Sequence, residues 1–310
     1  FGSIPGRLDS FTVVLKPDTI AAEYWAGAPS VVVDKDGTFW MACRMRTAKA
    51  PRGRRGYEIR ILSSHDGVQF RREKSIRCDQ VPIPGFERPA LLYDAAKHIF
   101  KLYGCGPWQG GPWSIIKWPD VKDPHAWQAH TAYPVITPAK PRFERDIKVL
   151  EFKDPVLFYS DAIYHCYVIG YVRNLERIFH FSSRDGEQWQ AVGAPNQSLL
   201  PLSGWHDFFV RPSAVLPLGV GYLFFYEGSC CSWYDPVYNV VTGLAFTYDL
   251  HHLIDLTPTS PLFVSSTPSR FYTWRYSHWL RVRNELWVYA EVADRNETSE
   301  IRLFKLKSTE

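Results

Sequence analysis

The chain has 310 residues, of which 45% are hydrophobic and 22% charged, and this ordinary globular balance excludes a disordered or collagen-like protein. Its 36 basic and 32 acidic residues leave a formal net charge of +4, which is too balanced for a nucleic-acid binder or a membrane-surface protein. No apolar run approaches the roughly 20 residues that a membrane-spanning helix needs. Aromatic residues reach 15%, and this bias favours strands over helices.

The six cysteines show no CxxC spacing, which argues against a structural zinc or a thioredoxin-like site. We expect neither a metal nor another cofactor. The chain opens at Phe1 without a charged and apolar leader, so a cytoplasmic location and secretion after loss of a signal peptide both stay open.

An internal repeat is the main feature of the sequence. A proline or bulky residue, a strand, a short turn and a second strand recur five times, with anchors separated by 60, 66, 57 and 67 residues. The anchors are Pro29, Pro89, Pro155, Pro212 and Trp279. The strand pairs occupy Ala28–Arg46, Arg88–Cys105, Asp154–Tyr171, Arg211–Gly228 and His278–Val292. This spacing predicts one β-sheet unit per period.

Each repeat continues with a strand, a polar turn and an aromatic residue. These second halves are Ile61–Phe70, Ser114–Trp127, His180–Trp189 and Gly243–Leu253, whereas the fifth, Glu300–Leu306, stops early. We expect the N-terminal strand Phe11–Leu15 to complete that last unit. The sequence therefore predicts an all-β protein, a single five-bladed β-propeller domain over residues 1–310, with four-stranded antiparallel blades around a central funnel. The alternative is a β-sandwich with coincidental spacing.

The propeller geometry selects candidate catalytic residues. The first residue of the innermost strand of a blade and the last residue of its second strand lie on the same rim of the funnel. Three carboxylates take such positions in successive blades, namely Glu87, Asp154 and Glu227. Acid and base chemistry on a glycosidic bond needs carboxyl groups that converge in this way. The structural alternatives are a turn cap for Asp154, an ion pair with Arg88 or Arg211 for Glu87, and a strand-end acid for Glu227.

Aromatic and basic residues at the same rim are candidates for substrate binding. They are Trp25, Arg46, Arg88, Trp108, Arg211, Tyr276 and His278, with Trp279 as a further flat face for a sugar ring. The arginine-rich run from Arg44 to Arg60 is either a solvated loop or a lid that brings positive charge to a carboxylated sugar or to phosphate. Because the three carboxylates can balance the arginines, a neutral sugar is the simpler substrate.

The chain resembles the five-bladed propeller enzymes of glycoside hydrolase families 43, 32, 62, 68 and 130. The run FKDPVLFYSDAIYHCYV (Phe152–Val168) is similar to the Asp-Pro strand start of families 32 and 43, which implies that Asp154 tunes the acid or stabilises the transition state. The run FERPALLYD (Phe86–Asp94) resembles the blade-two strand of family 130, and the late segments Gly243–Leu253 and Ser260–Ser266 also match the pattern. Ala28 stands where family 43 has its catalytic Asp, and Arg88 stands where family 130 has its acid, which leaves Glu87 as the nearest carboxyl.

The resemblance and the converging carboxylates together predict a glycoside hydrolase that cleaves a terminal sugar from a glycan or oligosaccharide by carboxylate acid and base catalysis, with inversion. Its partner is a carbohydrate substrate, and neither nucleic acid nor a membrane is expected. The alternatives are a glycoside phosphorylase of the family 130 type, in which arginines hold phosphate, and a carbohydrate-binding propeller without turnover.

Overall fold

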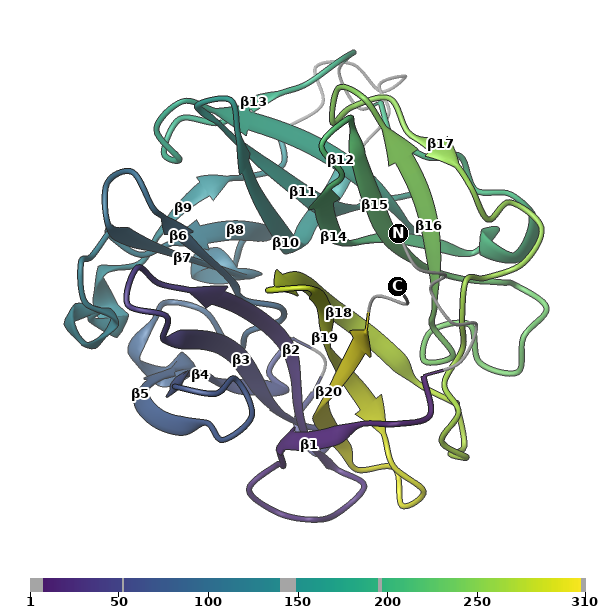
Figure 1. The fold of residues 1–310 in the computed structure, drawn as a ribbon, viewed down its shortest axis with the longest axis horizontal. Helices are drawn as coiled ribbons and strands as arrows, with labels where there is room; N and C mark the ends of the chain where they lie inside the picture. The colour runs from purple at the N-terminus through teal and green to yellow at the C-terminus, as the bar shows by residue number, and fades with distance from the viewer. Residues whose placement is uncertain (1–7, 52, 140–148, 195–196, 308–310) are drawn as a thin grey trace.

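The computed structural model describes residues 8–51, 53–139, 149–194 and 197–307. Within them the chain forms five antiparallel blades of four strands arranged around a centre (Figure 1), and one parallel pairing, Trp25 with Ser299, joins the first and last blades into a single eight-stranded sheet. Blade 1 consists of β2 (Tyr24–Val33), β3 (Phe39–Thr47), β4 (Gly56–Ser64) and β5 (Arg71–Arg77). Blade 2 consists of β6 (Ala90–Asp94), β7 (Ile99–Pro107), β8 (Trp113–Lys117) and β9 (Tyr133–Ile136).

Blade 3 consists of β10 (Val149–Ser160), β11 (Ile163–Val172), β12 (Leu175–Ser183) and β13 (Gln190–Ala191). Blade 4 consists of β14 (Phe209–Pro217), β15 (Tyr222–Ser229), β16 (Val241–Thr247) and β17 (Ile254–Asp255). Blade 5 combines β18 (Trp274–Val282), β19 (Glu285–Ala293) and β20 (Ser299–Lys307) with the N-terminal strand β1 (Thr12–Leu15). The predicted five-bladed propeller is confirmed, and so is the completion of the last blade by the N-terminal strand.

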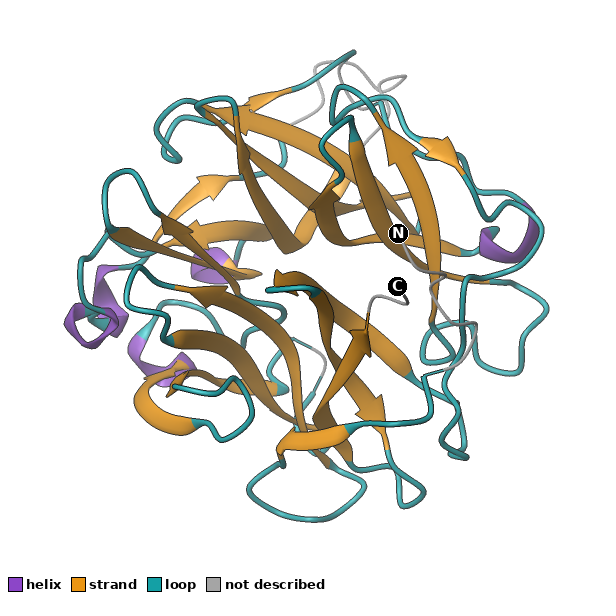
Figure 2. Cartoon of the chain, viewed as in Figure 1, coloured by secondary structure: helices purple, strands orange, loops and turns teal. Residues whose placement is uncertain are grey.

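In the described residues, regular secondary structure outside the strands is limited to short 3₁₀ turns, most of which lie near the periphery (Figure 2). Within the described ranges they are η1 (Cys78–Gln80), η2 (Trp108–Gly110), η3 (Pro124–Ala126), η4 (Ala129–Thr131) and η5 (Gly204–His206). None of these described helical turns has the length and apolarity that crossing a membrane requires.

The apolar core lies between the blades. Each of five buried clusters draws its side chains from two neighbouring blades, so each interface has its own core. Between blades 1 and 2, for example, Trp40 and Ile59 pack with Leu102 and Trp118. Successive side chains of a strand point to opposite faces of its sheet, so each blade presents one set of side chains to the blade before it and another set to the blade after it. Burial at these interfaces holds the blades in a ring.

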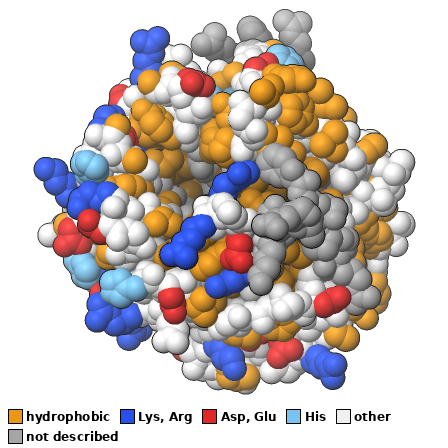
Figure 3. Space-filling view, viewed as in Figure 1, with side chains coloured by type: hydrophobic (Ala, Val, Ile, Leu, Met, Phe, Trp, Pro, Cys, Tyr) orange, Lys and Arg blue, Asp and Glu red, His pale blue; other side chains and the backbone are white. Residues whose placement is uncertain are grey.

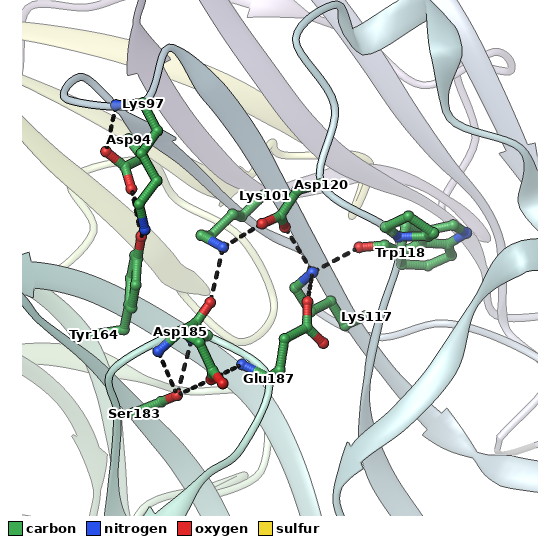
Figure 4. Close-up of polar contacts among 12 residues, drawn as sticks. Asp94, Lys97, Lys101, Lys117, Trp118, Asp120, Tyr164, Ser183, Asp185 and Glu187 are labelled. Atoms are coloured by element: carbon green, nitrogen blue, oxygen red, sulfur yellow. Dashed lines mark hydrogen bonds and ion pairs between the residues drawn. The ribbon is translucent and has the colours of Figure 1, made fainter.

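Blades 2 and 3 are also joined by two buried lysines (Figure 4). Lys117 is fully buried and its ammonium group contacts Asp120 and Glu187, both at 2.6 Å. Lys101 forms an ion pair with the same Asp120 and donates a hydrogen bond to the Asp185 carbonyl at 3.1 Å. Since every ammonium group has an acidic partner, this cluster is a cross-link between blades, and it lies outside the funnel.

The inner strands carry a backbone irregularity that shapes the centre. Register shifts interrupt the β2, β10, β14 and β18 ladders near their first residues. At three of these bulges a non-glycine residue has a positive φ, namely Ala28 (52°), Asp154 (52°) and Tyr276 (55°). A bulge re-aims the side chains next to it, and here it directs them to the axis. On the face drawn in Figure 3, basic and acidic side chains lie close to the centre of the disc.

Candidate active site

The candidate site is the end of the funnel at which the inner strands begin, here called the mouth. It is lined by Trp25, Glu87, Lys153, Arg211 and Arg275. Register pairs Trp25 with Arg46, Arg211 with Glu227 and Arg275 with Glu291. The rule that joins the starts of inner strands to the ends of second strands thus holds, and charged side chains from all five blades meet around the axis.

Glu291 anchors one side of this network. It accepts hydrogen bonds from Arg44 at 3.0 Å, from Arg275 at 2.8 and 3.0 Å, and from the Ala28 backbone N–H at 3.1 Å. A Cβ at Gly27 would lie 1.7 Å from the Glu291 carboxylate, so only glycine lets this acid approach the β2 backbone. The carboxylate fixes two guanidinium groups from neighbouring blades, Arg44 and Arg275.

Glu87 is the candidate carboxylate that reaches solvent. Its side chain is 14% exposed and forms an ion pair with the buried Arg44. Burial alone would raise the pKa of Glu87, but the positive charges of Arg46, Arg44 and Lys153 outweigh it and hold that pKa well below the usual range. Glu87 is therefore an ionised carboxylate at neutral pH, able to accept a proton.

Asp154 lies deeper, at the bulge of β10. It is buried and accepts hydrogen bonds from the Arg88 backbone N–H at 3.0 Å and from the Tyr276 hydroxyl at 3.3 Å. The thiol of Cys105 lies 3.7 Å from the same carboxylate. Tyr276 in turn lies among the guanidinium groups of Arg44, Arg275 and Arg88, which are 5.2, 5.2 and 5.9 Å from its ring centre.

Arg88 closes the funnel below this layer. Its guanidinium group is buried and donates to the carbonyls of Pro212, Ser213 and Ser277 at 3.1, 2.8 and 3.4 Å. These carbonyls belong to blades 4 and 5, so an arginine from the start of blade 2 crosses the axis. Arg88 is thus part of the floor of the site.

Glu227 lies at that floor and is completely buried. It accepts hydrogen bonds from the Ser277 backbone N–H at 3.0 Å and from the Ser213 hydroxyl at 3.2 Å. Burial raises the pKa of Glu227, and the charge of Arg88 offsets only part of this effect. Glu227 therefore converges on the axis as predicted, but beneath the layer that a ligand at the mouth would touch.

Arg211 pairs with an acid that lies outside the strand positions predicted to reach the rim of the funnel. Glu176, the second residue of β12, forms ion pairs with Arg211 and, at 3.7 Å, with Lys153. Lys153 stays 13% exposed at its side chain and lies 5.0 Å from the ring centre of Tyr171. Burial would lower the pKa of Lys153, yet Glu176 and its other neighbours raise it, so Lys153 is a cation at the mouth.

Arg46 and Trp25 form the opposite side of the mouth. The guanidinium group lies 4.7 Å from the centre of the Trp25 ring, a cation–π contact. Next to it, Tyr238 accepts a hydrogen bond from Arg55 at 3.0 Å, and its ring lies 5.7 Å from the guanidinium group of Arg275. The predicted basic run therefore does reach the mouth through Arg44, Arg46 and Arg55.

The rest of that run has other roles. Arg60 pairs with Glu58 at 2.7 Å and with Asp18 at 2.9 Å, away from the network around Glu87. Lys49 lies over the ring of Tyr24, and Arg54 is exposed. Arg52 lies outside the described residues.

Three aromatic or polar candidates are not brought to the mouth by any contact described for them. Trp108 packs against the core between blades 1 and 2. His278 lines a separate cavity of about 30 Å³ on the far side of Arg88. Trp279 stacks on Phe225 with ring centres 3.9 Å apart, so its expected role as a sugar platform is wrong and it belongs to the core.

Sequence reasoning missed Glu176, Arg275 and Tyr238. Glu176 is the second residue of the third strand of its blade, and including the starts of third strands among the rim positions would have found it. The β18 bulge shifts the phase of the inner strand, so that Arg275 pairs with Glu291 one residue before the expected Tyr276. Tyr238 lies in a loop, where strand periodicity carries no signal.

The arrangement can bind a small polar ligand and hold charge around it. Within the described part of the chain, no three His, Cys, Asp or Glu side chains are grouped so that they could hold a metal ion. The mouth offers a partly exposed and ionised carboxylate, Glu87, with cations acting on it, and the ring of Trp25 beside Arg46. These groups suit proton transfer and the recognition of a hydroxylated or anionic molecule.

Comparison with known proteins gives matches of fold alone. No protein-family model matches the chain, and no curated protein matches its sequence. Among solved structures it is similar to BT0996 in a complex with RGII, with a TM-score of 0.74, 15% identity, and coverage of 98% of this protein and 92% of that one. It is also similar to a glycosyl hydrolase from Bacteroides ovatus, with a TM-score of 0.71 and 15% identity. The match covers 99% of this protein and 96% of that one.

A third similar structure is the β-1,2-mannobiose phosphorylase from Listeria innocua in complex with β-1,2-mannobiose. Its TM-score is 0.67 at 14% identity, with 95% of this protein and 94% of that one covered. Such likenesses extend over almost the whole length of the chain at identities too low to carry an activity. The resemblance drawn from the strand motifs is thereby confirmed at the level of architecture: the chain has the propeller fold that these glycoside hydrolases and this phosphorylase share.

Proposed function

We propose that the protein is a glycoside hydrolase that removes a terminal sugar from a glycan, with the sugar bound in the mouth of the funnel. The observation that carries this proposal is the ionised and partly exposed carboxylate of Glu87, set among cations and aromatic rings at the centre of the propeller. A funnel at the hub of one ring suits a single sugar end better than a long internal stretch of a glycan.

Glu87 is the proton acceptor in this proposal. A water molecule placed between Glu87 and the anomeric carbon would lose a proton to the carboxylate as its oxygen bonds to that carbon, while the glycosidic C–O bond breaks and the leaving oxygen takes a proton from solvent. Direct attack of water inverts the anomeric configuration. Proton NMR of the first-formed product therefore tests the assignment, because a retained configuration would make Glu87 a nucleophile and not a base.

Asp154 serves as a charge beneath the sugar. Its carboxylate is held by the Arg88 backbone N–H and the Tyr276 hydroxyl, so it is fixed before substrate arrives. A fixed negative charge stabilises the positive charge that develops on the sugar ring. Glu227 acts as a positioning residue, because it is completely buried and joins the ends of blades 4 and 5 through Ser213 and Ser277.

Phosphorolysis is the second candidate, and the excess of cations at the mouth favours it. Arg44, Arg46, Arg275, Arg211 and Lys153 face three carboxylates, Glu87, Glu291 and Glu176. Phosphate in the place of water would meet this positive surplus.

Turnover of a panel of aryl glycosides, with and without inorganic phosphate, separates the candidates. Hydrolysis without phosphate that is lost in Glu87→Gln supports the proposal. Product formation only with phosphate, recovered as a sugar phosphate, supports phosphorolysis. Sugar binding without turnover of any member of the panel would identify a carbohydrate-binding propeller and overturn both enzymatic functions.

A further inference from the structure

Arg46 and Arg55 are the two cations of the mouth for which the described residues show no ion pair, and Arg55 donates a hydrogen bond to the Tyr238 hydroxyl instead. Arg44, Arg211, Arg275 and Lys153 each lie within ion-pair distance of a glutamate. Arg46 is only 6% exposed, its Nε is buried without a hydrogen-bond partner, and among the described residues no carboxylate forms an ion pair with it. A buried and unpaired guanidinium group is costly, and a structure that retains one keeps it for a group that arrives from outside.

Two further arginines, Arg275 and Arg55, lie with Arg46 around the phenol of Tyr238. Burial would raise the pKa of Tyr238, but Arg46, Arg275 and Arg55 outweigh it and lower that pKa. Three arginines therefore act on one phenol at this corner of the mouth. Glu87 is the acidic group that acts most strongly on Arg46, and its charge is already paired with Arg44.

The shape of the group at Arg46 selects the ligand. Its guanidinium carbon lies 4.7 Å from the centre of the Trp25 ring, a contact that uses none of its N–H donors, and its buried Nε has no hydrogen-bond partner. This planar fork matches the two oxygens of a carboxylate. A monoanion also suits the site better than a dianion, because the ionised Glu87 lies close by and repels negative charge.

We infer that Arg46 and Trp25 form a subsite for the carboxylate of an acidic sugar, so that the terminal unit of the substrate is a uronic acid. This inference rests on the proposed function and replaces the neutral sugar expected from the sequence. The sugar ring then lies toward Glu87, and its carboxylate toward the corner formed by Arg46, Arg55 and Arg275.

The test compares ligands that differ by a single group. Methyl glucuronide and methyl galacturonide are titrated against their uncharged uronamides and against the matching methyl hexosides, with binding followed by NMR or calorimetry. We expect at least one uronide to bind 10-fold or more tightly than its own amide, and the preference to shrink as salt is raised. If the unmodified protein binds a uronide and its uronamide with equal affinity, the inference is overturned.

Variants locate the effect. Arg46→Gln should remove most of the preference for acid over amide while changing the affinity for the amide little, and Arg46→Lys should restore only part of it, because lysine lacks the fork. Arg54→Gln is the matched control, since Arg54 is an exposed arginine of the same segment. If inorganic phosphate binds through Arg46 and no uronide does, the ligand is phosphate and the uronate inference is wrong.

The outcomes for binding and for catalysis are separable. Binding of a uronide that depends on Arg46, without turnover of any uronide, would leave the subsite in place and remove the hydrolase proposal. Turnover of neutral glycosides alone, unaffected by Arg46→Gln, would keep the hydrolase and remove the subsite.

Discussion

Glu87 shows how the charges of a few neighbours set the role of one residue. Its carboxylate has the burial that ordinarily favours the protonated form, yet four cations act on it, Arg46, Arg44, Lys153 and Arg275. The surplus of positive charge decides the outcome, because each cation stabilises the ionised form. A carboxylate so stabilised is a weak but permanently available base, and its availability extends to acidic pH.

Substitution of this residue gives the first prediction. Glu87→Gln keeps the size and removes the charge, so kcat should fall by about 10²–10⁴, the usual contribution of a general base. Steady-state kinetics on the best aryl glycoside measures the change. Glu285→Gln, at the opposite end of β19 from Glu291, is the control and should leave kcat unchanged. Loss of activity in both variants would point to a structural effect.

The second prediction concerns the backbone at Asp154. Its φ of 52° lies in the left-handed region, which asparagine tolerates better than most residues. Asp154→Asn should therefore retain most of the stability while lowering turnover, whereas Asp154→Val should destabilise the fold strongly. Thermal unfolding and kcat, measured on both variants, separate charge from conformation. Equal loss of Tm in the two would show that the carboxylate itself holds the bulge.

A third prediction follows from the depth of Glu227. Within the described part of the mouth, no exposed carboxyl has a raised pKa, so the leaving oxygen receives little help from a protein acid. Hydrolysis rates should then fall steeply as the leaving group becomes more basic. A plot of log kcat/KM against leaving-group pKa measures this slope. A flat plot that becomes steep in Glu227→Gln would make Glu227 the acid and overturn its role as a positioning residue.

At the scale of single residues, the sequence predicted where charge gathers but not how deep each group lies. Glu87 and Glu227 look equivalent as strand-end acids, yet one reaches solvent and the other is covered by Arg88. Depth depends on which side chain crosses the axis, and Arg88 does so through hydrogen bonds to carbonyls of blades 4 and 5. Sequence periodicity carries no information about such a crossing.

Among the elements, the bulged inner strands determine which residues face the axis. Each strand follows a regular alternation until the bulge, where one extra residue changes the phase. The repeated Pro29 and Pro155 mark two of these positions in the sequence, since proline lacks the N–H of a regular ladder. In β18 a serine follows Tyr276, so that bulge has no proline signal, and the phase of Arg275 could not be predicted.

The fourth prediction tests the link between blades 2 and 3. Lys117→Met removes an ammonium group that contacts Asp120 and Glu187, and the free energy of unfolding should fall by about 1.5–3 kcal/mol, the range for hydrogen bonds to charged groups. The loss stays in this range because both acids are partly exposed and regain water. Chemical denaturation measures it. Lys122→Met, at an exposed lysine, is the control, and an equal loss there would show that the contacts of Lys117 add no stability.

For the whole molecule, the buried ionisable groups predict how stability depends on pH. Neighbouring cations depress the pKa of Glu87 and Glu291 in the folded state, so the stability they contribute is complete above their unfolded pKa near 4.3 and is lost as pH falls through the lower folded values. Burial lowers the pKa of His180 and His278 to about 3, so protonation of the unfolded state below about pH 6.5 also favours unfolding. Glu227, with a raised pKa, acts in the opposite sense.

The fifth prediction is the resulting pH profile. Tm should be nearly constant above about pH 6.5, decline gradually below it and fall more steeply below about pH 4.5. Differential scanning calorimetry between pH 3 and 8 measures the profile. A Tm that stays constant down to pH 4 would mean that the histidines have ordinary pKa values in the folded protein, and the absence of a steeper fall between pH 4.5 and 3 would mean the same for the glutamates.

The architecture of the whole molecule was the most predictable level. Five repeated strand pairs, spaced by about 60 residues, leave few arrangements other than a ring, because each sheet needs a neighbour on both faces. Even the pairing of the first strand with the last blade followed from the short fifth repeat. The repeats could not predict which side chains fill the funnel, because those side chains come from positions that differ between the repeats.

The closure of the ring has a consequence in time. Thr12 in β1 pairs with Leu303, which lies 291 positions later in the sequence. At a synthesis rate of about 5–20 residues per second, the first strand waits on the order of 15–60 s before its partner exists. During that interval it is an unpaired apolar strand, open to pairing with other newly made chains. The yield of folded protein should therefore fall as ribosomes are packed more closely on the messenger RNA, and slower initiation of translation should raise that yield.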